Sequence, residues 1–146
     1  MPKQYVYSFT KIDNGSRRPL VPIRLTNPKT GLSVNVMALL DTGADACLLP
    51  KYIADGTGHD LKNSDAICNK TVGAGGQPIN TWGHTFDIEL LYSQNNSYQS
   101  VWKSKKTIIE CVEHNNIPPL LGVQNFLKDL KITFNYPTNK IIIELP

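Results

Sequence analysis

The chain has 146 residues, the usual length of one domain, and its net charge at neutral pH is only +3. Its composition, 40% hydrophobic and 18% charged, excludes an intrinsically disordered chain. No apolar run approaches the ~20 residues of a membrane-spanning helix, and the positive charges are too scattered to indicate nucleic-acid binding by themselves. We therefore expect one domain over residues 1–146, with neither a membrane nor a nucleic acid as partner.

The three cysteines, Cys47, Cys68 and Cys111, indicate a reducing compartment, because they are odd in number and far apart in the sequence. They include no C-x-x-C pair, and the nearest histidine is the lone His114, so they do not form the four-ligand set of a structural zinc site. We expect three buried or half-buried free thiols, no metal and no cofactor. The start M-P-K-Q-Y-V-Y lacks the apolar core of a secretory signal, and we expect a cytoplasmic protein.

The first half of the chain predicts two strands joined by a turn. Residues 20–25 and 33–40 are strand-like runs, and N-P-K-T-G at 27–31 is a turn-rich linker between them. In the second run one face is apolar throughout, comprising Val34, Val36, Ala38 and Leu40.

The second half predicts further strands, one short helix and a closing hairpin. Apolar residues alternate over 85–92, and strands at 100–103 and 106–112 follow a polar loop at 93–99. Helical spacing is kept well only by Val123, Phe126, Leu127 and Leu130. Strands at 131–135 and 140–145 enclose the turn Y-P-T-N at 136–139. The pattern is mostly β with one late helix, which predicts a barrel or a sandwich.

The segment A-L-L-D-T-G-A-D at 38–45 carries the chemistry, because an apolar strand there runs into Asp41, Thr42 and Gly43. A carboxylate at a strand end in a glycine-containing turn is held rigidly, and the missing side chain at Gly43 lets another backbone come close. The Thr42 hydroxyl both donates and accepts, so it can tie the loop to a facing one. Alone, D-T-G is also compatible with a polar turn between strands, because so short a motif arises by chance.

Four segments in order resemble the retropepsins, the retroviral-type aspartic proteases. L-L-D-T-G-A-D at 39–45 is similar to their active-site signature, and R-P-L-V at 18–21 to the segment before their first barrel strand. K-T-V-G-A-G-G-Q-P-I-N-T-W-G at 70–83 resembles their glycine-rich flap hairpin, and P-L-L-G at 119–122 resembles the element before their helix. The ordered set spans about residues 18–135 and is more specific than any one motif.

The resemblance implies an all-β closed barrel with a flap hairpin, and an aspartic endopeptidase that acts on peptide or protein substrates. In this chemistry two carboxyl groups share one proton and act as base and acid. Because the chain has one D-T-G, the resemblance implies a homodimer in which each chain contributes Asp41. Thr42 then braces the paired loops, and Gly43 permits their close approach.

The family pattern also implies binding residues. Asp45 matches a position that binds the substrate backbone and pairs with an arginine of the other subunit, here Arg18. The expected substrate-binding residues are Ala44, Asp45, Val72, Gly73, Ala74, Gly75, Gly76, Pro118 and Leu120. Three of them, Ala44, Pro118 and Leu120, are also compatible with core or loop positions, and the flap glycines with a plain turn. Trp82 either packs over the cleft or fills the barrel.

The sequence departs from the retroviral pattern at two points. Val123 stands where retroviral members carry an arginine that braces the active-site loop and the dimer, so either the brace differs here or the dimer is weaker. The terminal hairpin, 131–146, extends past the last retroviral strand and resembles the cellular and bacterial branch of the family. Because consecutive isoleucines cannot all face one side of a strand, we expect this hairpin to build a dimer sheet, with Ile141 and Ile143 as contacts beside Arg18, Thr42 and Asp45. The alternative is that the late helix and a neighbouring strand cover both faces within one chain.

Two other functions stay open from the residues alone. A catalytically inactive module with this fold would use its cleft or a sheet edge to bind a peptide, although pure binding needs neither D-T-G nor a glycine flap. Nucleic-acid binding is supported only by a cluster of three lysines, Lys103, Lys105 and Lys106. We interpret this cluster as a solvated hairpin turn, because three lysines are fewer than a phosphate-binding surface uses. Serine and cysteine peptidase chemistry lacks a nucleophile motif, and we expect surface or strand histidines at His59, His84 and His114.

Overall fold

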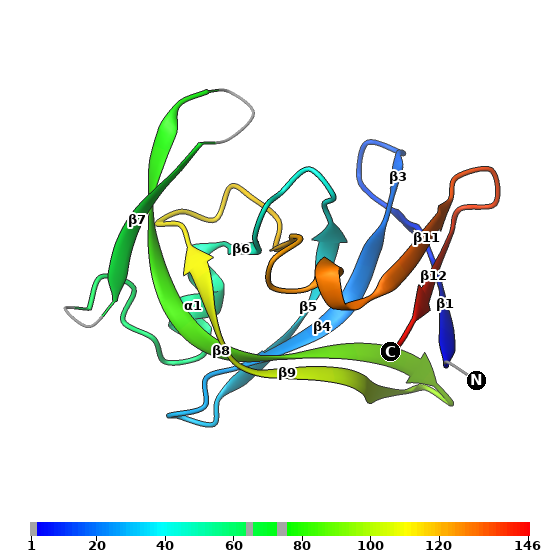
Figure 1. Ribbon diagram of the computed structural model, residues 1–146, viewed down its shortest axis with the longest axis horizontal. Coiled ribbons are helices and arrows are strands. Elements are labelled where there is room, and N and C mark those ends of the chain that lie inside the picture. The colour runs from blue at the N-terminus through cyan, green and yellow to red at the C-terminus, as the bar shows by residue number, and fades with distance from the viewer. Residues whose placement is uncertain (1–2, 64–65, 73–75) are drawn as a thin grey trace.

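A computed structural model describes residues 3–63, 66–72 and 76–146, and it is built mainly of strands (Figure 1). In chain order they are β1 (Gln4–Ser8), β2 (Thr10–Lys11), β3 (Arg17–Arg18), β4 (Leu20–Thr26), β5 (Ser33–Leu40), β6 (Leu48–Leu49), β7 (Ile67–Val72), β8 (Pro78–Gln94), β9 (Ser97–Cys111), β10 (Leu120–Leu121), β11 (Lys131–Asn135) and β12 (Lys140–Glu144). Helical structure in the described residues comprises α1 (Lys51–Gly56) and the 3-10 turn η1 (Leu127–Asp129). None of it is long and apolar enough to cross a membrane.

The main sheet has the strand order β4-β5-β10-β6-β9-β8-β7, and β4 also pairs with β8. Six strands therefore form a closed circuit of pairings around the core, in the order β4-β5-β10-β6-β9-β8 and back to β4. β7 lies outside this circuit and pairs with the first part of β8 (Figure 1). The predicted alternation holds for Phe86, Ile88 and Leu90, all fully buried. Leu91 is buried as well, because the pairing of β8 with β9 shifts register between Leu90 and Leu91.

A second sheet, in the order β1-β12-β11, corrects the expected role of the C-terminal isoleucines. β12 is the central strand, so its backbone is paired on both sides within one chain. Ile141 and Ile143 are fully buried in the core of that chain, and Ile142 lies half-buried on the opposite face. Ile141 and Ile143 are therefore core residues and not dimer contacts, because no surface of either side chain is left for a second chain.

The turns follow local chemistry, with one correction. In the linker 27–31 the Gly31 amide donates to the Asn27 carbonyl at 2.8 Å, and Gly31 has a φ of 74°. The expected polar loop at 93–99 is instead a tight turn between β8 and β9. Its central residues, Asn95 and Asn96, have φ values of 53° and 62°, which asparagine adopts more readily than most residues. The strands therefore extend almost to the turn on both sides.

The predicted late helix is reduced to the single turn η1, and the only α-helix of the described residues, α1, was not predicted. The helical spacing of residues 123–130 marks burial, since Phe126 is fully buried and packs on Trp102 with ring centroids 5.1 Å apart. The backbone amides of Val123 and Gln124 donate to other parts of the chain, and Phe126 has a φ of −144°, outside the helical range. A regular helix does not form there.

The lysine cluster lies within β9, so the interpretation of these lysines as a solvated hairpin turn is wrong. Lys106 has a φ of 50°, and its amide donates to Asp87 Oδ1 at 2.9 Å. This is the point at which the pairing of β8 with β9 is irregular. Lys103 Nζ lies 3.7 Å from a carboxylate oxygen of Glu89. The basic residues thus mark a bulge in a long strand.

Candidate active site

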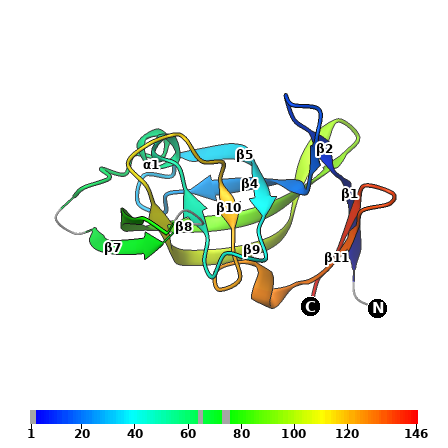
Figure 2. The ribbon, with the colours of Figure 1, turned by 90° about the horizontal axis from the view of Figure 1, so that it is seen from above.

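The loop that carries Asp41 begins where β5 ends and is held from the side by β10, which lies between β5 and β6 (Figure 2). β5 and β10 run parallel, with Leu39 opposite Leu120 and Leu40 opposite Leu121. The Asp41 amide donates to the Leu121 carbonyl at 3.0 Å. The backbone of Asp41 is therefore fixed by the sheet itself.

Hydrogen bonds within the loop orient the Asp41 carboxylate. Its Oδ1 accepts from the Gly43 amide at 3.0 Å, and the Asp41 carbonyl accepts from the Ala44 amide at 3.2 Å. An aspartate that binds the amide two residues on forms an Asx turn, which accounts for the sharp bend at D-T-G. Asp41 is half-buried, and Thr42 and Gly43 are exposed. The loop places a fixed carboxylate at the molecular surface.

Gly122 lets the chain after β10 touch the chain after Asp41. A Cβ on Gly122 would overlap the carbonyl carbon and oxygen of Ala46 and lie 2.8 Å from its Cα. The next two amides, of Val123 and Gln124, donate to the carbonyls of Ala44 and Asp45 at 3.0 and 2.8 Å. The two segments are therefore joined by their backbones, which requires glycine at this point.

The side chain of Asn125 holds the active-site loop in place, a role that the sequence analysis did not predict. Its Oδ1 accepts from the Cys47 amide at 2.8 Å, and its Nδ2 donates to the Ile108 carbonyl at 3.3 Å. One amide thus ties the segment after Asp41 to β9. The position after Gly122, where retroviral members carry arginine, contributes the Val123 backbone amide instead.

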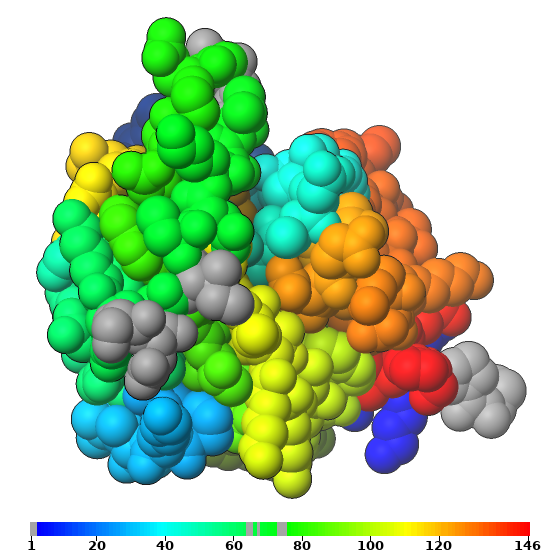
Figure 3. Space-filling model, turned by 60° about the vertical axis from the view of Figure 1, so that its left-hand side comes forward, coloured from blue at the N-terminus to red at the C-terminus, as the bar shows by residue number. Residues whose placement is uncertain are grey.

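A cavity of about 700 Å³ lies beside Asp41, between this loop and the arms of the β7–β8 hairpin. Figure 3 shows that hairpin in green, beside the cyan segment after β5 and the orange segment after β10. The cavity brings together six predicted residues, Asp41, Gly43, Ala44, Asp45, Val72 and Leu120. It is also lined by six residues that sequence reasoning missed, Ala46, Cys47, Leu48, Thr71, Ile79 and Glu110.

The predicted flap is a hairpin whose arms, β7 and β8, pair from Ile67 opposite Gly83 to Val72 opposite Pro78. Its predicted tip residues Gly73, Ala74 and Gly75 lie outside the described residues. Gly76 is exposed with a φ of 75° and does not line the cavity. Pro118, also predicted to bind substrate, is exposed and likewise lies outside the lining.

Other predicted residues lie as follows. Arg18, on β3, and Asp45 are both exposed, and their pairing between two chains stays a prediction. Trp82 fills the core, with 8% of its surface exposed, and does not line the cavity. Lys62 Nζ lies 5.1 Å from the centroid of the Trp82 ring.

The buried thiols offer no alternative nucleophile, and of the three cysteines only Cys47 lines the cavity. Burial raises the pKa of Cys47 to about 11 and that of Cys111 to about 12, and the Glu110 carboxylate adds to the second shift. Both thiols therefore stay protonated at neutral pH, when only a thiolate is a good nucleophile. Cys68 is exposed, contrary to the expected burial. The described part of the chain holds no cluster of three or more metal-ligating side chains.

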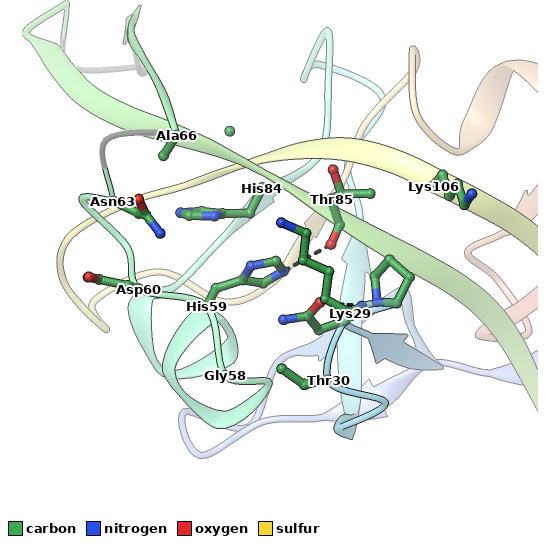
Figure 4. A pocket seen from close by; sticks show the side chains of 13 residues that line it. Lys29, Thr30, Gly58, His59, Asp60, Asn63, Ala66, His84, Thr85 and Lys106 are labelled. Atoms are coloured by element: carbon green, nitrogen blue, oxygen red, sulfur yellow. Dashed lines mark hydrogen bonds between the residues drawn. The ribbon is translucent and has the colours of Figure 1, made fainter.

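A second cavity, of about 530 Å³, shares no lining residue with the first and brings two histidines together (Figure 4). The ring centroids of His59 and His84 are 4.6 Å apart. His59 Nε2 donates to the Thr85 carbonyl at 2.9 Å, and His84 Nε2 donates to the Leu61 carbonyl at 2.8 Å. Burial is the largest cause that lowers the pKa of His59; the hydrogen bond to Thr85 opposes it, and electrostatic repulsion by His84 and Lys29 adds to it.

We expect acid to destabilise the protein in part through His59. Because the folded-state pKa lies below the ordinary 6.5, the unfolded chain takes up the proton first, and stability present above about pH 6.5 is lost as the pH falls towards the folded-state pKa. His59→Gln keeps a donor for the Thr85 carbonyl but does not titrate. Urea unfolding between about pH 7.5 and about pH 5 measures the effect. We expect the free energy of unfolding of wild type to fall more over this pH range than that of His59→Gln. An equal fall in the two proteins contradicts the expectation.

No protein-family model and no curated protein matches the sequence. Among solved structures, a retropepsin-like aspartic protease from Rickettsia conorii matches 99% of this chain and 94% of its own, with a TM-score of 0.62 and 15% identity. The EIAV protease complexed with the inhibitor HBY-793 matches 81% of this chain and 92% of its own, with a TM-score of 0.43 and 18% identity. The retroviral protease-like domain of Ddi1 from Leishmania major matches 87% and 92%, with a TM-score of 0.43 and 14% identity.

The first of these matches runs over nearly the whole of both chains, so it covers the Asp41 loop, the β7–β8 hairpin and the C-terminal sheet alike. At 15% identity such a match carries the fold and nothing finer. The closed circuit of six strands and the pairing of β5 with β10 beside D-T-G agree with the fold that the ordered motifs predict. The chain therefore has the fold of the retropepsin-like aspartic proteases.

Proposed function

We propose that the protein is an aspartic endopeptidase, acting as a homodimer in which two Asp41 carboxylates activate a water molecule. The observation that carries the proposal is the Asp41 loop itself. Its carboxylate is oriented by the Gly43 amide, its backbone is held by β10, and it lies in the wall of a cavity of about 700 Å³. The size is that of an ordinary ligand pocket. A plain polar turn needs neither the cavity nor the hairpin beside it.

Two carboxylates divide the chemistry. One takes a proton from water as the oxygen attacks the peptide carbonyl, and the other, protonated, gives its proton to the reacting amide, after which the C–N bond breaks and the amine leaves. Each chain supplies one such loop, so the second carboxylate comes from a second copy across a two-fold axis. The exposed Thr42 is then available to bind the facing loop, and Arg18 to pair with Asp45 of the other copy. The apolar walls at Ala44 and Leu120 accept substrate side chains.

The wider setting of the proposal is one domain over residues 1–146 that needs no cofactor. The three free cysteines support a reducing compartment such as the cytoplasm. The partners are a peptide or protein substrate and a second copy of the chain, without membrane or nucleic acid.

Mixing wild-type and Asp41→Asn chains tests whether two carboxylates act together. At constant total concentration, with half the chains exchanged to the variant, hydrolysis of a quenched-fluorescence peptide library falls to about one quarter, because only dimers with two Asp41 residues are active. A self-sufficient single chain falls to about one half and contradicts the paired site. A wild-type chain that binds library peptides but never cleaves them identifies the inactive binding module instead.

A further inference from the structure

The cavity beside Asp41 has a charge opposite to that of the protein. Its described lining contains three carboxylates, Asp41, Asp45 and Glu110, and no lysine, arginine or histidine. The whole chain carries a net charge of +3. Lys70 of the neighbouring strand β7 does not line the cavity. A cavity of this kind favours a positively charged ligand group.

Glu110 is the carboxylate that the proposed chemistry does not use, and it is held in place from two strands. Its Oε1 accepts a hydrogen bond from Thr81 Oγ1 at 2.7 Å and another from Asn69 Nδ2 at 2.9 Å. Thr81 is fully buried, so its hydroxyl depends on this partner. Both bonds go to Oε1, which leaves Oε2 without a hydrogen-bond partner among the described residues.

Gly83 makes room for this carboxylate. It lies opposite Glu110 in the pairing of β8 with β9, and a Cβ on Gly83 would come within 2.7 Å of Glu110 Oε2. On the other side of Glu110, Leu48 of β6 lies opposite it in the pairing of β6 with β9, so Glu110 stands between two paired strands. A side chain that is already ordered loses little entropy on binding a ligand, which makes it a selective contact.

We propose that Glu110 is a specificity-determining residue that selects peptides carrying a lysine or arginine side chain, and this rests on the proposed peptidase function of the same cavity. The cationic head of the peptide side chain binds the Glu110 carboxylate in a charge-assisted hydrogen bond. Its aliphatic stem packs on the apolar wall formed by Leu48 and Ile79. A neutral side chain of similar length makes the second contact but not the first.

Positional-scanning peptide libraries, in which one position at a time is fixed, test the inference on the wild-type chain. We expect hydrolysis to be about 10-fold or more faster with lysine or arginine than with methionine at one position relative to the cleaved bond. The preference weakens as salt is raised, because charge pairs are screened. A profile without a basic preference at any position overturns the inference.

Glu110→Gln removes the charge while keeping the shape, and it reduces the ratio of lysine to methionine cleavage towards unity. Glu113→Gln is the matched control: it removes the same charge from an exposed residue that pairs with Lys62 and lies outside the cavity lining, so it leaves the ratio as in wild type. Thr81→Val, which removes one donor to Glu110, lowers the ratio partly. A ratio in Glu110→Gln equal to that in Glu113→Gln overturns the inference.

Binding to the Asp41→Asn chain separates this inference from the proposed function. The same libraries are captured on that variant, and the retained peptides are sequenced. Enrichment of lysine and arginine that Glu110→Gln abolishes supports the role of Glu110 even when the wild type cleaves nothing, a result that would refute only the peptidase. If the wild type cleaves peptides but the captured peptides are not enriched in lysine and arginine, the peptidase proposal is retained and the role of Glu110 is overturned.

Discussion

Asp41→Asn lowers peptide hydrolysis by about 10⁴-fold or more, because a side-chain amide cannot take the proton of the attacking water. The substitution leaves the fold in place. Asparagine has the size of aspartate, and its carbonyl oxygen can still accept the hydrogen bond that Asp41 Oδ1 accepts from the Gly43 amide. Since Asp41 is half-buried and lies at the surface, we expect the free energy of unfolding to change by less than about 1 kcal/mol.

The measurement pairs initial rates on a cleavable peptide with urea unfolding of the same preparations. Asp55→Asn is the matched control: it makes the same chemical change at an exposed carboxylate that pairs with Lys51 in α1, outside the cavity lining. Its rate equals that of wild type. Hydrolysis that persists in folded Asp41→Asn places the chemistry elsewhere in the protein.

Gly122→Ala destabilises the protein strongly and inactivates it at the same time. The new methyl group would overlap the Ala46 backbone, and backbone atoms cannot move aside as the end of a flexible side chain can. Relief requires separating the chain after β10 from the chain after Asp41, which breaks the bonds from Val123 and Gln124 to the carbonyls of Ala44 and Asp45. We expect a loss of about 1–3 kcal/mol or more in the free energy of unfolding.

Gly56→Ala provides the control, since its Cβ would meet one side-chain atom, Val34 Cγ1, at 3.3 Å and no backbone atom within 4 Å. Urea unfolding midpoints of the two variants are compared with that of wild type, together with hydrolysis rates measured where each variant is folded. A Gly122→Ala chain as stable and as active as Gly56→Ala would show that the backbone approach at Ala46 plays no structural role.

The strands were predictable because their signals are local. Period-two alternation and turn residues placed β5 and β11 at their observed bounds, Ser33–Leu40 and Lys131–Asn135. The Asp41 turn was equally local, since an aspartate and a glycine two residues on are sufficient for an Asx turn. The order of four such segments was enough to identify the fold, because order and spacing together are far rarer than any one motif.

Local sequence patterns gave wrong predictions where they indicate that a residue is buried but not which backbone conformation or which partner buries it. The apolar spacing of 123–130 is helical, yet Phe126 has a φ of −144°, and the regular helical structure of the segment is the 3-10 turn η1. Burial of Ile141 and Ile143 was similarly assigned to a second chain. The pairing of β12 with both β1 and β11 provides that burial within the chain, and no local pattern reports which strand lies at a sheet's centre.

The sequence by itself determined β4, β5, β11 and β12, the turns that join them in pairs, and the D-T-G loop, because each depends on neighbours a few residues away. Only the tertiary structure decided which distant residues share the cavity with that loop. Glu110 reaches it because β6 pairs with β9 in a register that sets Leu48 opposite Glu110. Asn125 reaches the Cys47 amide only because Gly122 allows two backbones to touch. Such contacts depend on strand pairing across the whole chain, which short-range patterns do not encode.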